Sequence, residues 1–115
     1  MSRRSSSEAL KIQQHADIFA ALGDPVRLTL VAKLVGGKPH SISELTEGTK
    51  ITRQAVTKHL RVLEDVGVVE SAKNGRENLY ELNTKPFESL QIYLDVIAKQ
   101  WDQSLQNLKA FVETE

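Results

Sequence analysis

The sequence contains no cysteine among its 115 residues, which excludes disulfide bonds, thiolate catalysis and metal sites built on thiolates. It also lacks an apolar run of the roughly 20 residues that a membrane-spanning helix needs, and its serine-rich start lacks the apolar stretch of a secretory signal. We therefore expect a cytoplasmic protein. Its length fits one small domain, because compact domains most often contain about 100 to 150 residues.

The formal net charge is zero, with 15 basic and 15 acidic residues. Proteins that bind nucleic acids usually carry a basic surface, so the total charge by itself argues against that function. The distribution is more informative. Residues 50–61 contain four basic side chains and no acid, whereas residues 86–115 contain five acids and only two lysines. The basic charge is therefore concentrated in the middle of the chain.

Apolar residues at helical spacing predict two helices in the first third of the chain, after a flexible polar arm over residues 1–10. The first helix extends over residues 12–22 and ends at Gly23. The second begins at Asp24-Pro25, a strong helix start, and ends near Val35 before two glycines. We expect residues 11–83 to form the main domain.

A helix-turn-helix is predicted next. Ser41 and Glu44 match a capping box, which indicates a short helix, and a tight turn over residues 48–51 follows it. Thr52 then caps a helix that extends to Val66. Two helices joined by such a turn form the basic unit of many DNA-binding domains.

The period of the apolar residues then changes to that of strands, over residues 68–73 and 76–82. Asn74-Gly75 between the two runs predicts a two-stranded hairpin, or wing, closed by a type I′ turn. The tip of this wing carries Lys73 and Arg76.

A long helix over about residues 86–112, capped by Asn83 or Thr84, completes residues 84–115. At 1.5 Å per residue it measures roughly 40 Å, more than a domain of this size can cover, so its apolar stripe predicts a partner helix. The expected fold is mainly α, with five helices and a two-stranded wing. The residues predicted at the dimer interface are Ile12, Phe19, Phe87, Leu90, Leu94, Ile97, Trp101, Leu105 and Leu108.

The helix over residues 52–66 divides into a packed face and a face of hydrogen-bond donors. Gln54 suits adenine, Arg53 or Lys58 suits guanine, and Thr57 suits a base edge or a thymine methyl group. Arg61 suits a phosphate group. The residues predicted to contact double-stranded DNA are Thr52, Arg53, Gln54, Thr57, Lys58, Arg61, Lys73 and Arg76.

Four segments together resemble the arsenic-repressor (ArsR/SmtB) family: Ala21–Arg27, Ile42–Leu45, Ile51–Leu60 and Leu63–Val69. The resemblance covers roughly residues 12–83. It implies a winged-helix homodimer that binds an imperfect palindrome and represses transcription until a signal releases it. It also implies that residues 52–66 form the recognition helix.

The sequence departs from the family's metal sensors. Ser41 and Ser43 stand where many members have a Cys-x-Cys metal site, and no histidine follows Pro86. His15 and His40 are too scattered to share an ion, and His59 lies on the packed face of its helix. We expect no cofactor and no metal site, and the sequence does not identify an inducer.

Two alternatives remain open. A winged helix can serve as a protein-interaction module without specific DNA binding, and its basic face would then be incidental. Trp101 could line a small-molecule site, although its place on the apolar stripe favours dimer packing.

The Arg27 side chain could either bond to the end of a helix or contact a phosphate group. The sequence contains no nucleophile motif or phosphate-binding glycine loop, so an enzyme is not expected.

Overall fold

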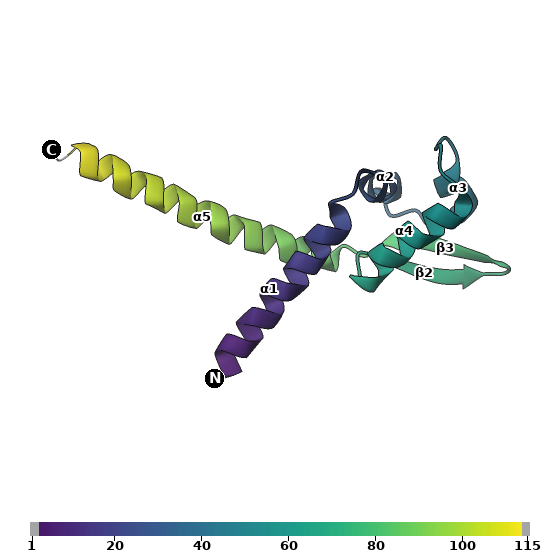
Figure 1. Ribbon diagram of the computed structural model, residues 1–115, viewed down its shortest axis with the longest axis horizontal. Helices are drawn as coiled ribbons and strands as arrows, with labels where there is room; N and C mark the ends of the chain where they lie inside the picture. Colours follow the sequence, from purple (N-terminus) through teal and green to yellow (C-terminus); the bar gives the residue numbers. More distant parts are fainter. Residues whose placement is uncertain (1–2, 114–115) are drawn as a thin grey trace.

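The computed structural model describes residues 3–113, which form five helices and a three-stranded antiparallel sheet (Figure 1). The predicted winged helix-turn-helix fold, mainly α, is confirmed. Met1 and Ser2 of the predicted arm, and Thr114 and Glu115 at the end of the predicted segment 84–115, lie outside the described residues. The elements in chain order are α1 (Arg3–Leu22), α2 (Pro25–Leu34), β1 (His40–Ser41), α3 (Ile42–Thr46), α4 (Arg53–Asp65), β2 (Val69–Asn74), β3 (Glu77–Leu82) and α5 (Lys85–Glu113).

Helix α1 begins at Arg3, well before the predicted start at Ile12. The segment that the sequence predicted to be a flexible arm is therefore helical from Arg3 onward. Residues 7–14 are all exposed, so no apolar face marks this part of the helix. The periodicity of apolar residues could not detect it for this reason. In Figure 1 the first half of α1 projects away from the rest of the domain.

The predicted caps of α2, α3 and α4 are confirmed. The Asp24 carboxylate accepts a hydrogen bond of 3.0 Å from the backbone N–H of Arg27, and the Thr52 hydroxyl accepts one of 3.1 Å from that of Ala55. Ser41 and Glu44 form the expected capping box, in which each side chain accepts from the other's backbone N–H at 3.1 Å. These bonds satisfy donors that a helix start leaves without partners, and so they fix where α2, α3 and α4 begin.

The wing differs from the prediction in its turn. Asn74 pairs with Glu77, so the two loop residues are Gly75 and Arg76. Gly75 has a φ of +67°, and no described residue other than glycine has a positive φ. This pattern matches a type II′ turn, with glycine at the first central position, and the predicted type I′ turn is wrong.

The sheet contains a third strand that the sequence did not reveal. The two-residue strand β1 pairs with β3 and gives the order β1-β3-β2. Because β1 leads directly into α3, its pairing ties the start of the helix-turn-helix to the base of the wing. The pairs are His40 with Tyr80 and Ser41 with Leu79.

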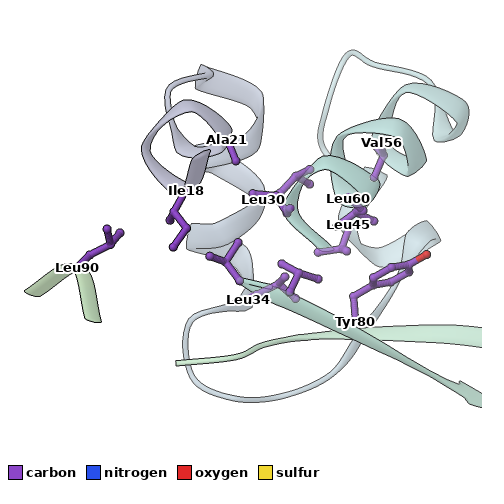
Figure 2. Packing of buried hydrophobic residues seen from close by; sticks show 12 residues of the cluster. Ile18, Ala21, Leu30, Leu34, Leu45, Val56, Leu60, Tyr80 and Leu90 are labelled. Atoms are coloured by element: carbon purple, nitrogen blue, oxygen red, sulfur yellow. The ribbon is translucent and has the colours of Figure 1, made fainter. Parts of the chain in front are cut away.

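The core lies where α1, α2, α3, α4 and the sheet meet (Figure 2). Leucines of α2 and α3 are almost fully buried around the inner face of α4, and the ring of Tyr80 closes the core at the sheet. Burial raises the pKa of the Tyr80 hydroxyl above its usual value of 10.0. The most deeply buried side chains are Leu30, Leu34, Leu45, Val56, Leu60, Leu63 and Val68.

Helix α5 contains 29 residues and packs on the domain only at its start (Figure 1). Leu90 is 5% exposed and Phe87 packs against the core, whereas the apolar side chains farther along the helix are exposed. The longest dimension of the described chain is 69 Å, which reflects this projecting helix. No helix in residues 3–113 has the length and apolar character needed to span a membrane.

Candidate nucleic-acid interface

The structure confirms that α4 has two faces. Its inner face is fixed by Val56, Leu60 and Leu63, all with no exposed area. On the outer face Arg53, Gln54, Lys58 and Arg61 are exposed. Within residues 3–113 the side chains of these four residues have no hydrogen-bond or ion-pair partner, so their donors are free to bind another molecule. With Thr57 and Ile42 they line a shallow hollow along the helix.

Thr52 and Thr57 are less available than the sequence suggested. The Thr52 hydroxyl accepts the capping bond from Ala55. Thr57 is half-buried, and its hydroxyl donates a hydrogen bond of 2.8 Å to the carbonyl oxygen of Arg53, one turn earlier in the same helix. Such a bond occupies the single donor of a threonine, which leaves its methyl group and acceptor lone pairs for any contact outside the helix.

The wing turn lies beside the start of α4. Arg76 of the turn and Arg53 of α4 line one hollow, together with residues 41–43 at the start of α3 and residues 77–78 of β3. Lys73 pairs with Asn78 near the tip and is exposed. The structure therefore brings the two predicted groups of basic residues, on the helix and on the wing, to the same side of the domain.

The two faces of the wing ribbon differ in charge. Neighbouring residues along a strand point to opposite faces, so Glu70, Glu77 and Glu81 share one face and Lys73 lies on the other. Glu70 and Glu81 are directly paired across the two strands, where like charges repel. Since DNA is a polyanion, the face with Lys73 suits it and the acidic face does not.

A lysine of α2 helps to hold the helix-turn-helix together. The Lys33 ammonium group donates hydrogen bonds of 3.1 Å to the carbonyl oxygen of Leu45 and 2.9 Å to that of Glu47, at the end of α3. A cation there satisfies carbonyl groups that the helix end leaves without partners. The sequence analysis missed this role, because no local pattern connects Lys33 to a helix end that lies more than ten residues later.

Arg27 has a structural role, one of the two that the sequence allowed. Its guanidinium donates to the carbonyl oxygens of Ala20 and Ala21 at the end of α1, and one nitrogen lies 3.4 Å from Nδ1 of His59. His59 also lies 3.9 Å from the Asp24 carboxylate and is half-buried behind the outer face of α4. This polar cluster joins the end of α1 and the start of α2 to α4.

The predicted interface residues fall into two groups. Phe87 and Leu90 belong to the core of the domain, whereas the other residues are exposed: Ile12, Phe19, Leu94, Ile97, Trp101, Leu105 and Leu108. Between α1 and α5, His15 stacks at 4.7 Å on Tyr93, and its Nε2 lies 3.0 Å from the Ser89 hydroxyl. Residues 3–113 contain no cluster of three side chains that could hold a metal ion.

We expect the stability of this framework to fall in acid as its caps become protonated. Hydrogen bonding from the Arg27 backbone lowers the pKa of Asp24 below 3.8, and that from Ser41 lowers the pKa of Glu44 below 4.5. A carboxylate with a lowered pKa stabilises the fold above its unfolded pKa, and the contribution is lost as pH falls through the lowered value. Melting temperature should therefore decrease below about pH 4.5.

The variant Asp24→Asn keeps a capping oxygen but does not titrate. Its melting temperature should lie below that of the wild type above about pH 5, where the ionised Asp24 contributes its full stabilisation, and the difference should shrink between about pH 4 and pH 2. Asp102→Asn, the same change at an exposed position of α5 far from any helix start, is the control. Equal pH dependence in wild type and Asp24→Asn would show that the cap charge does not contribute.

The second helix of the helix-turn-helix has a face of free donors, and a basic wing lies beside it. These two features define a DNA-binding transcriptional regulator of the winged-helix class.

A family model described as a helix-turn-helix domain matches residues 22–72. The chain is 38% identical over 79 residues to the HTH-type transcriptional regulator YuzN of Bacillus subtilis, a match that covers 64% of this chain and 86% of YuzN. It is 29% identical over 89 residues to the HTH-type transcriptional repressor SmtB of Mycobacterium tuberculosis, covering 77% of this chain and 64% of SmtB.

Comparison with solved structures indicates the same family. An ArsR-like transcriptional regulator from Rhodococcus sp. RHA1 superimposes with a TM-score of 0.81 at 34% identity, covering 90% of this chain and 94% of the other. The chain belongs to the ArsR/SmtB family of winged helix-turn-helix transcriptional regulators. The relatives reported above are named as transcriptional regulators and not as enzymes, and nothing in their names favours the alternative of a protein-interaction module.

Proposed function

We propose that the protein is a repressor that binds an imperfect palindrome in DNA as a homodimer, with α4 in the major groove and the wing against the backbone. The free donor face of α4 is the observation that carries this proposal. A major groove admits one α-helix, and a helix that reads it needs one packed face and one face of free donors. Acting on DNA, such a regulator would work in the cytoplasm.

The exposure and the chemistry of each side chain indicate which part of the DNA it would contact. Gln54 and Lys58 are exposed on the outer face, where they can meet base edges, and Arg61 one turn after Lys58 suits a phosphate group. Thr57 would contribute its methyl group to a thymine. Lys73 and Arg76 of the wing would bind the backbone, and Thr52 would act chiefly as the cap of α4.

The homodimer is supported by the apolar stripe of α5. Within residues 91–113 no apolar side chain belongs to the core, yet Leu94, Ile97 and Trp101 expose large apolar surfaces on one side. A stripe at near-heptad spacing is stable only against another helix, and a second copy of α5 has the complementary pattern. Two copies would place their α4 helices in successive major grooves, about 34–36 Å apart.

The position of Ser41 supports a regulator without a thiolate metal switch. Ser41 is only 7% exposed, and both its hydroxyl and its backbone N–H are used in the capping box of α3. Because both groups are already hydrogen-bonded within the domain, Ser41 is not available as a metal ligand. We propose no cofactor for this protein, and its release from DNA would depend on a signal that acts elsewhere on the molecule.

The proposed function can be tested by selecting bound sequences from a pool of random duplexes, each about three helical turns long. The wild type should enrich a near-palindrome, and its affinity should fall steeply between about 50 and 200 mM salt because bound phosphates release counterions. Lys58→Ala should weaken binding about tenfold or more, while Lys99→Ala, the same change on α5, should leave it unaltered. Enrichment of no sequence, or equal effects of the two variants, would contradict the proposal.

A further inference from the structure

Arg53 stands at a junction of three elements. It is the first residue of α4, and it lines the hollow along the outer face of that helix. It also lines the hollow that Arg76 of the wing turn shares with Ser43 and Asn78. A residue in the middle of α4, such as Lys58, borders only the first of these hollows. Arg53 is therefore the residue of the outer face that lies next to the wing.

The hollow between α4 and the wing has the donors that an anion needs. Arg53 and Arg76 are exposed, and within residues 3–113 neither guanidinium has a hydrogen bond or an ion pair. The Ser43 hydroxyl and the Asn78 amide add neutral donors. Two guanidinium groups around one space repel each other unless a negative charge lies between them, and the planar fork of arginine matches a phosphate group.

The one acid at this hollow does not neutralise the arginines. Glu77 lines the hollow but forms no ion pair with Arg53 or Arg76. By its register it belongs to the face of the wing that carries Glu70 and Glu81, opposite to that of Asn78. The hollow therefore keeps an excess of positive charge on the side that would meet DNA.

We propose that Arg53 and Arg76 together bind one phosphodiester group of the DNA backbone in this hollow. The inference rests on the proposed DNA-binding function and assigns a different role to Arg53 from the one that the sequence suggested. Arg53 sets the position of α4 along the duplex instead of reading a guanine. Base recognition is then left to Gln54, Lys58 and the methyl group of Thr57.

The salt dependence of the affinity for DNA distinguishes one phosphate group bound by both arginines from two phosphate groups bound separately. Each phosphate neutralised on a B-form duplex contributes about 0.9 to the slope of log affinity against log salt concentration. The double variant Arg53→Ala/Arg76→Ala should therefore lower that slope by about 0.9, whereas loss of two independent phosphate contacts would lower it by about 1.8. Each single variant should weaken binding about tenfold or more, and the double variant by less than the product.

The probes are the duplex selected by the wild-type protein and a scrambled duplex of the same length and composition. Arg53→Ala should weaken binding to both by the same factor, because a phosphate contact carries no sequence information. Gln54→Ala should instead reduce the preference for the selected duplex and leave the salt slope unchanged. Arg61→Ala combined with Arg76→Ala is the matched control, and its effects should multiply because Arg61 borders only the hollow along α4.

Two results would overturn the proposal of a shared phosphate group. One is a loss of sequence preference in Arg53→Ala. The other is that the effects of Arg53→Ala and Arg76→Ala on affinity multiply while their effects on the salt slope add. Circular dichroism and melting temperature should be unchanged in all variants, since every substituted side chain is exposed. Failure of the proposed function has a different signature: the wild type itself would then show no preference for any duplex.

Discussion

Replacing Leu60 by alanine should lower the free energy of unfolding by about 2–5 kcal/mol, the usual cost of emptying a well-packed leucine site. Leu60 has no exposed area and lies at the centre of the inner face of α4 (Figure 2). Since small domains are stable by only about 5–15 kcal/mol, this loss is a large fraction of the total stability. Urea titration followed by circular dichroism measures the change.

Lys58→Ala provides the control for this prediction, because Lys58 lies two residues before Leu60 on the opposite face of the same helix. Its free energy of unfolding should change by no more than about 0.5 kcal/mol, as for most exposed positions. The two neighbouring substitutions should thus separate stability from DNA binding. Equal losses of stability would show that α4 does not pack on its Leu60 face.

Replacing Ile97 by glutamate should convert the dimer into monomers at micromolar concentration. In one chain Ile97 is 43% exposed, on the same stripe as Leu94 and Trp101. A carboxylate there would be buried in the seam of both copies without a partner, at a cost of several kcal/mol in total. Sedimentation should show the change in mass, and affinity for the selected duplex should fall by at least a hundredfold because two half-sites are no longer bound together.

Lys99→Glu is the matched control, since Lys99 is exposed two residues later and about 200° away around the helix. It should remain dimeric. Trp101, the only tryptophan, is 65% exposed in one chain, so dimerisation should shift its fluorescence to shorter wavelength and dilution should reverse the shift. A folded wild-type monomer at micromolar concentration would contradict the dimer.

The features that could be predicted from the sequence are those with a local cause. Asp24, Ser41 and Thr52 cap helices through bonds to residues three positions later, so the pattern of a few neighbouring residues was sufficient. The two faces of α4 follow in the same way from helical periodicity. The start of α1 could not be located, because residues 7–14 are exposed on every side of the helix and have no apolar repeat.

Features that depend on distant residues were missed. Strand β1 exists only because β3 offers it a partner, and the bonds of Lys33 to the end of α3 connect residues that lie close only in the folded chain. The wing was predicted, but its turn was misplaced by one residue because Asn74 remained in the strand ladder. For the candidate site, the sequence identified the basic residues but not that Arg53 lies beside Arg76.

The acidic outer face of the wing also affects how the protein approaches DNA. With a net charge of zero, the molecule has no overall attraction to a distant duplex. Its charge is instead unevenly distributed, because Arg53, Arg61 and Arg76 are exposed along α4 and at the wing turn, whereas Glu70 and Glu81 share the acidic face of the wing. Within about one Debye length, roughly 10 Å at 0.1 M salt, the field of DNA exerts a torque on such a molecule. Collisions are thereby oriented before any contact forms, and dissociation after a wrong encounter is fast.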